Sequence, residues 1–127
     1  MKLTNASVTI NETASIEDCL GHKGGAIEGF GNSIIIVEGT IKNNQGSDSA
    51  GAIYVENSTI ELKGNANTQG NVGHHQASAI YLLSGNELTM EDNDDVITGN
   101  EVINQYGGGV AVIKSTITMN EGSITNN

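Results

Sequence analysis

The sequence predicts an all-β fold, a right-handed parallel β-helix with three strands per coil and about four to five coils, in a single domain over residues 1–127. Two observations predict this fold. Short apolar segments recur at intervals of roughly 27 residues along the whole chain. Within each segment apolar and polar residues alternate, as in a strand that buries one face. Such short strands cannot bury their inward faces alone, but stacked coils cover one another.

The apolar residues fall into three columns that we expect to point into the core. The first column consists of pairs that flank one outward residue: Val8/Ile10, Ile34/Ile36, Ile60/Leu62, Leu88/Met90 and Ile117/Met119. The second follows a motif of small residues and consists of Ile27/Gly29, Ile53/Val55, Ile80/Leu82 and Val110/Val112. The third contains Ile16, Ile41, Thr68, Ile97 and Ile124. Adjacent coils should lie about 4.8 Å apart, the spacing of hydrogen-bonded strands.

A polar column accompanies the third apolar column. Three residues after its members stand Cys19, Asn44, Asn71, Asn100 and Asn127. Inward asparagine amides can bond to the coils above and below, as in the ladders of stacked sheets. An antiparallel sandwich is the alternative fold, but it gives no reason for asparagine at one place in each period. We therefore predict a structural ladder of Asn44, Asn71, Asn100 and Asn127.

The composition limits the classes of partner. The formal net charge is −10, and an acidic surface repels phosphate backbones, so nucleic acid is not an expected partner. The lysines are scattered singly, which leaves no basic patch for anionic lipid. No apolar run approaches the ~20 residues of a membrane span, so we expect no membrane insertion by this segment. Cys19 is the single cysteine and is expected to be a small buried residue.

The first residues, MKLTNASVTI, lack the apolar region of a signal peptide. The alternatives are a cytosolic protein or a piece of a longer exported chain. We expect the second, a fragment of a longer solenoid that is extracellular or at the cell surface, with its export signal outside this segment. Neither end carries an amphipathic helix or a polar capping coil, so end-to-end self-association is also an expectation.

Two tetrapeptides recur once per coil. The first is GGAI at 24–27, with the variants AGAI at 50–53, ASAI at 77–80 and GGGV at 107–110. The second reads IKNN at 41–44, TQGN at 68–71, ITGN at 97–100 and ITNN at 124–127. They resemble the GGAI and FxxN repeats of the chlamydial polymorphic membrane proteins, although no second motif here contains phenylalanine. The resemblance implies an autotransporter passenger domain that acts as an adhesin, with a host surface or a polysaccharide as its partner.

Enzymes with this fold are mainly polysaccharide lyases and glycosidases. A lyase commonly uses arginine or lysine as its base, but the chain has no arginine and its lysines fall in different slots of their coils. A glycosidase needs two carboxylates ~5–10 Å apart, and carboxylates do follow the first column in several coils: Glu12, Glu38, Asp92 and Glu121. A solvated acidic face is the favoured interpretation, because like charges are common at exposed turns. We expect no enzymatic activity and keep a carbohydrate-active β-helix as an alternative.

The histidines give a metal-binding alternative. His22, Asp48 and His75 each stand five residues before a second-column isoleucine, which predicts one column on consecutive coils. Imidazole and carboxylate groups suit zinc, whereas exposed turn residues are the simpler interpretation. The segment EDNDD at 91–95 is likewise open to weak calcium binding or to a plain acidic loop. We expect no cofactor and keep zinc or calcium as alternatives.

Tyr54 and Tyr81 occupy the outward position of the second-column strand in neighbouring coils. We expect them to stack on the surface, where tyrosine offers an apolar face and a hydroxyl. One interpretation is a small patch for carbohydrate or a partner, and the other is cross-coil packing that shields the sheet. The favoured function is a non-enzymatic surface or extracellular segment, an adhesin or a rigid binding scaffold.

Overall fold

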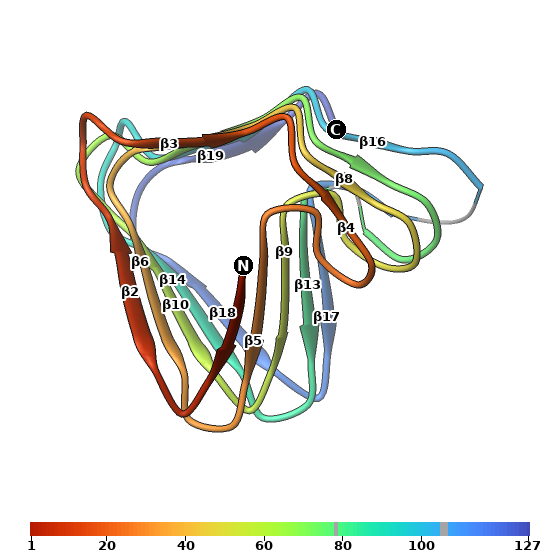
Figure 1. The fold of residues 1–127 in the computed structure, drawn as a ribbon. Coiled ribbons are helices and arrows are strands. Elements are labelled where there is room, and N and C mark those ends of the chain that lie inside the picture. The colour runs from red at the N-terminus through yellow and green to blue at the C-terminus, as the bar shows by residue number, and fades with distance from the viewer. Residues whose placement is uncertain (78, 105–106) are drawn as a thin grey trace.

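The computed structural model describes residues 1–77, 79–104 and 107–127, and all regular structure within them is β-strand. The strands pair in parallel and stack as four sheets along one axis (Figure 1). The predicted parallel β-helix is therefore confirmed. Among the described residues no helix is long and apolar enough to cross a membrane. Ser78, part of the ASAI variant of the first motif, lies outside the described residues.

Three five-stranded sheets enclose the core. Sheet A contains β1 (Lys2–Thr4), β5 (Ile27–Phe30), β9 (Ile53–Glu56), β13 (Ile80–Leu83) and β17 (Val110–Ile113). Sheet B contains β2 (Ser7–Ile10), β6 (Ile34–Val37), β10 (Thr59–Leu62), β14 (Glu87–Met90) and β18 (Thr116–Met119). Sheet C contains β3 (Ser15–Glu17), β7 (Thr40–Lys42), β11 (Asn67–Gln69), β15 (Val96–Thr98) and β19 (Ser123–Thr125).

A fourth sheet was not predicted. Sheet D contains the short strands β4 (Leu20–Gly21), β8 (Gln45–Gly46), β12 (Val72–Gly73) and β16 (Glu101–Val102). In Figure 1 it projects from the corner beside sheet A, and the chain then folds back to begin the next sheet A strand. We call sheet D and these returning loops the side lobe. The lobe adds a second, smaller layer outside the main core to the four coils that contain a sheet D strand.

Two of the three predicted apolar columns are confirmed by the strand registers. In sheet A, Ile27, Ile53 and Ile80 are partners in adjacent strands, and all three are fully buried. The third column is in register across all of sheet C. The inward residues of sheets A, B and C form one continuous apolar core, as the period of the repeat requires.

The first apolar column is wrong by one residue in its second coil. We expected Ile34 and Ile36 to point inward, but Ile35 and Val37 are fully buried and Ile34 is 43% exposed. Strand β6 consists of four consecutive β-branched apolar residues, so its own sequence does not identify the inward face. The register with β2 and β10 decides it, because a shift by one residue turns every side chain to the other face.

The asparagine ladder runs along the corner that follows sheet C. Oδ1 of Asn71 accepts from the backbone N–H and from Nδ2 of Asn44, both at 3.0 Å. Asn100 accepts from Asn71 in the same way at 2.9 and 2.9 Å, and Asn127 accepts from Asn100 at 3.2 and 2.7 Å. Cys19 begins the column, and its backbone N–H donates to Asn44 at 3.1 Å. Cys19 itself is half-buried, less enclosed than expected.

A second polar ladder, at the corner between sheets A and B, escaped the sequence analysis. The backbone N–H of Ser58 donates to Oδ1 of Asn86 at 2.9 Å. Asn86 donates from its backbone and from Nδ2 to Oγ of Ser115, at 3.2 and 3.1 Å. In the first coils, Oγ of Ser33 accepts the backbone N–H of Ala6 at 3.4 Å. The sequence signal for this ladder is the residue directly before each sheet B strand. This residue is alanine, serine or asparagine, and because its type varies, the repeat is difficult to recognise.

Thr68 is the only polar member of the third apolar column. It is fully buried, and its Oγ1 has no hydrogen-bond partner among the described residues. A buried hydroxyl without a partner destabilises a fold by about 1–3 kcal/mol. Thr68→Val keeps the shape of the side chain and removes this penalty. We expect it to raise the free energy of unfolding by about 1 kcal/mol in urea denaturation.

A matched control for Thr68→Val is Thr40→Val, on the outer face of the same sheet. Thr40 is only partly buried, and its replacement is expected to change the free energy of unfolding by less than about 0.5 kcal/mol. A Thr68→Val variant that is less stable than the wild-type protein would contradict the prediction.

Candidate functional site

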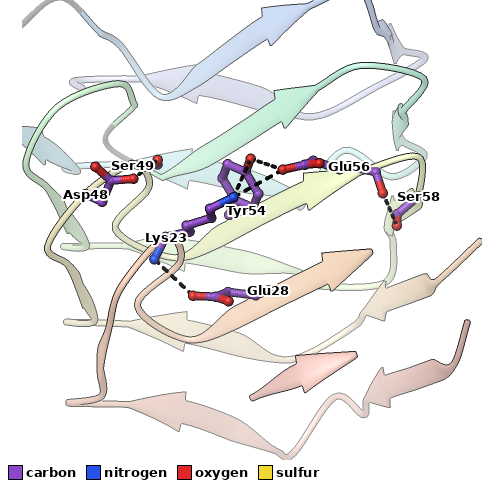
Figure 2. A network of polar contacts seen from close by, with 7 residues as sticks. All are labelled: Lys23, Glu28, Asp48, Ser49, Tyr54, Glu56 and Ser58. Atoms are coloured by element: carbon purple, nitrogen blue, oxygen red, sulfur yellow. Dashed lines mark hydrogen bonds and ion pairs between the residues drawn. The ribbon is translucent and has the colours of Figure 1, made fainter. Parts of the chain in front are cut away.

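A polar network lies on the outer face of sheet A, under the loop that follows β4 (Figure 2). The backbone N–H of Lys23 donates to Oε1 of Glu28 on β5 at 2.9 Å. Nζ of Lys23 lies 3.3 Å from Oε1 of Glu56 on β9 and 3.4 Å from the hydroxyl of Tyr54. The Tyr54 hydroxyl in turn donates to the Glu56 carboxylate. Lys23 therefore ties one loop of the side lobe to strands of two successive coils.

The aromatic rings beside Lys23 are enclosed by the lobe. The ring centroids of Tyr54 and Tyr81 lie 5.6 Å apart in a tilted arrangement. Nζ of Lys23 lies 4.7 Å from the Tyr54 centroid, within cation–π range. Tyr54 is 2% exposed and Tyr81 is 7% exposed, and both pack with Ala50 and Ala77 of the lobe. Of the two interpretations of these tyrosines, cross-coil packing is therefore the one observed, and they form no exposed patch because the lobe covers this part of sheet A.

The pKa shifts of Tyr54 and Glu56 favour a structural role for the network over proton transfer. Burial raises the pKa of the Tyr54 hydroxyl, and the hydrogen bond to Glu56 raises it further. The same hydrogen bond lowers the pKa of the Glu56 carboxyl, with Lys23 adding to the effect and burial opposing it. Tyr54 thus remains a protonated donor, whereas a general base or nucleophile would have to give up its proton. The three groups satisfy one another and hold the lobe against sheet A.

The network predicts a pH-dependent contribution to stability. Because Glu56 has a lowered pKa in the folded protein, its contribution is complete above the ordinary glutamate value of about 4.5 and is lost as the pH falls through the folded value. Glu56→Gln removes this dependence. We expect the variant to melt below the wild-type protein at about pH 7, and the difference to shrink on acidification to about pH 3.

The control for this titration is Glu121→Gln, at an exposed turn. Its melting temperature is expected to follow the wild-type curve at every pH. A Glu56→Gln difference that stayed constant across the acid range would contradict the role of the Glu56 carboxylate.

The predicted His22–Asp48–His75 column is wrong at His22, whereas Asp48 and His75 do correspond in neighbouring coils. In sheet D, Gly21, Gly46 and Gly73 are partners in adjacent strands. The residues that follow them, His22, Ser47 and His74, are therefore aligned. The loop after β4 is one residue shorter than those after β8 and β12, so counting back from the isoleucines shifts the alignment. Over residues 1–77, 79–104 and 107–127, no three His, Cys, Asp or Glu side chains are arranged to hold a metal ion.

The acidic segment 91–95 is a turn organised by its own carboxylates. Asp95 is fully buried and accepts backbone N–H groups from Ala66, Glu91 and Asp92 at 3.2, 3.1 and 3.0 Å. Asp92 accepts the backbone N–H of Gly64 at 2.7 Å. Carboxylates that pair with backbone amides at a turn account for this sequence without calcium.

The carboxylates considered for a glycosidase lie on the turns between sheets B and C. The shift in β6 takes Glu38 out of line with Glu12. Nζ of Lys63 lies 3.9 Å from Oε1 of Glu38 and 3.8 Å from Oε2 of Glu61. Glu12, Asp92 and Glu121 are exposed. Exposed carboxylates and a lysine paired with two glutamates fit the interpretation of a solvated charged surface.

Among the open hollows on the described surface, two have walls from three successive coils. One, of about 410 Å³, is on the side lobe and is lined by Leu20, Gly21, His22, Gln45, Ser47 and His74. There a ring nitrogen of His74 lies 2.7 Å from Nε2 of Gln45. The other, of about 570 Å³, is at the corner of sheets A and B and is lined by Thr59, Gly85, Asn86, Glu87, Lys114, Ser115 and Thr116.

No family model matches this chain, and neither a curated protein nor a solved structure shows significant similarity to it.

Proposed function

We propose that this chain is a non-enzymatic, rigid β-helix segment that acts outside the cell as an adhesin or binding scaffold. The observation that carries the proposal is the continuous asparagine ladder through Asn44, Asn71, Asn100 and Asn127. A paired amide network that is buried at Asn44, Asn71 and Asn100 fixes how one coil sits on the next. Such a structure suits a protein that must hold its outer faces in constant relative positions.

The outer faces support a binding role over a catalytic one. The Lys23–Tyr54–Glu56 network is internally satisfied and fastens the lobe. The hollows are open, and their walls come from several successive coils. A location at the cell surface is supported by the resemblance of the two coil motifs to those of surface adhesins, and it is part of the proposal.

Adherence of coated beads to cultured epithelial cells tests the adhesin role. Beads that carry the folded wild-type chain are expected to adhere more than beads that carry Asn71→Ala, assayed at a temperature where only the variant is unfolded. Equal adherence of the two would contradict the proposal. Release of reducing sugar from a panel of polysaccharides by the purified chain would favour the carbohydrate-active alternative instead.

A further inference from the structure

We propose that the hollow on the side lobe binds a carboxylate group, presented by an acidic sugar. The inference deepens the proposed binding scaffold by naming a ligand class, and it rests on that function. The hollow is lined by Leu20, Gly21, His22, Gln45, Ser47 and His74. No strand of the main core contributes to it, so a ligand can bind there without disturbing the fold.

The hydrogen-bonding groups of the hollow favour an anionic acceptor. Four of its six lining residues can donate: His22, Gln45, Ser47 and His74. A neutral imidazole donates one N–H, and in His74 this is at Nδ1, because its Nε2 accepts from Nε2 of Gln45. None of the lining residues is acidic, although the chain has 15 aspartates and glutamates. A carboxylate entering the hollow therefore meets donors and no like charge in the wall.

The coil repeat places these donors at regular intervals. His22, Ser47 and His74 follow the aligned strands β4, β8 and β12, so their backbones are spaced by about 4.8 Å along the axis. The Gln45 amide lies against the His74 ring at 2.7 Å, which holds both groups at one side of the hollow. Two oxygens of one carboxylate can each be reached by donors from neighbouring coils.

The apolar part of the hollow suits the ring of a sugar better than a simple inorganic anion. Leu20 is 80% exposed and offers an apolar wall for the C–H face of a sugar. Gly21 adds no side chain beside it. The buried rings of Tyr54 and Tyr81 are not accessible for stacking. Recognition at this place therefore depends on the charged group, which makes an acidic sugar a better ligand than a neutral one.

Nuclear magnetic resonance of the histidine rings tests this site in the full chain. The protein carries ¹³C-labelled histidine and is titrated with sodium glucuronate, with glucose and sodium chloride as comparison titrations. We expect saturable shifts of the His22 and His74 signals with glucuronate only, and little movement of His75. Two single variants are compared with the wild-type protein. The His74 signal in His22→Ala, and the His22 signal in His74→Ala, are each expected to report glucuronate binding about fivefold to tenfold weaker than in the wild-type protein.

The matched control is His75→Ala, since His75 is next to the hollow in sequence but does not line it. This variant is expected to bind glucuronate as the wild-type protein does. The site is overturned if glucuronate causes no saturable shift at tens of millimolar, if glucose acts equally, or if the His22 and His74 variants bind unchanged. Such a result would leave bead adherence unaffected, so failure of the site is distinguishable from failure of the scaffold function.

Discussion

Asn71→Ala is expected to lower the free energy of unfolding by about 3–5 kcal/mol, the largest effect of any side-chain truncation in the asparagine ladder. Asn71 accepts two hydrogen bonds from Asn44 and donates to Oδ1 of Asn100. Its Nδ2 also donates to the carbonyl oxygen of Ile41 at 3.0 Å. Alanine leaves the backbone N–H of Asn44 and the Ile41 carbonyl buried without this partner, and each unpaired group costs about 1–3 kcal/mol.

Urea denaturation followed by circular dichroism measures this loss directly. The control is Asn65→Ala, an exposed asparagine in a turn of the same coil, which is expected to stay within about 0.5 kcal/mol of the wild-type protein. If Asn71→Ala also stayed within that range, the ladder would not stabilise the coil stack, and the main support for a rigid scaffold would be lost.

The fold could be predicted from the sequence because the same pattern of inward apolar residues recurs once per coil. Ile27, Ile53 and Ile80 stand after one motif in successive periods, and a parallel stack is the arrangement that buries such residues together. Asn44 and Asn71 could be predicted as a ladder for the same reason. Within the three apolar columns, β6 was assigned to the wrong face, because a strand of four apolar residues has no alternation between apolar and polar residues.

The candidate sites were harder to predict because they depend on the side lobe. Periodicity places Tyr54 and Tyr81 on the outer face of sheet A correctly, but it does not say that a loop will cover them. The covering loop is signalled only by small residues: the first residue of the GGAI-type motif is Gly24, Ala50 or Ala77, and parallel bridges join these three positions. The alignment of histidines failed for the same reason, since loops of unequal length break the count.

Gly73→Ala is expected to destabilise the protein by about 3 kcal/mol or more and to open the side lobe. A Cβ at Gly73 would lie 1.9 Å from the carbonyl oxygen of Ala77 and 2.9 Å from that of Ser49. Both atoms belong to the backbone, so no side-chain rotation can relieve the clash. Gly46 repeats the geometry in the preceding coil, with a Cβ 1.9 Å from the carbonyl oxygen of Ala50.

Displacing the loop at Ala77 uncovers the tyrosines that it packs against. The chain has three tyrosines and no tryptophan, so quenching of tyrosine fluorescence by acrylamide reports this opening. Gly108→Ala is the matched control, since a Cβ there meets no atom within 4 Å, and it should leave both stability and quenching unchanged. The prediction is contradicted if Gly73→Ala is as stable as the wild-type protein and its tyrosine fluorescence is quenched no more. In that case the close backbone contact at Gly73 would not be needed to bury Tyr54 and Tyr81. If quenching rises while the core still unfolds cooperatively, the lobe is a separate layer whose closure depends on the glycine column of sheet D.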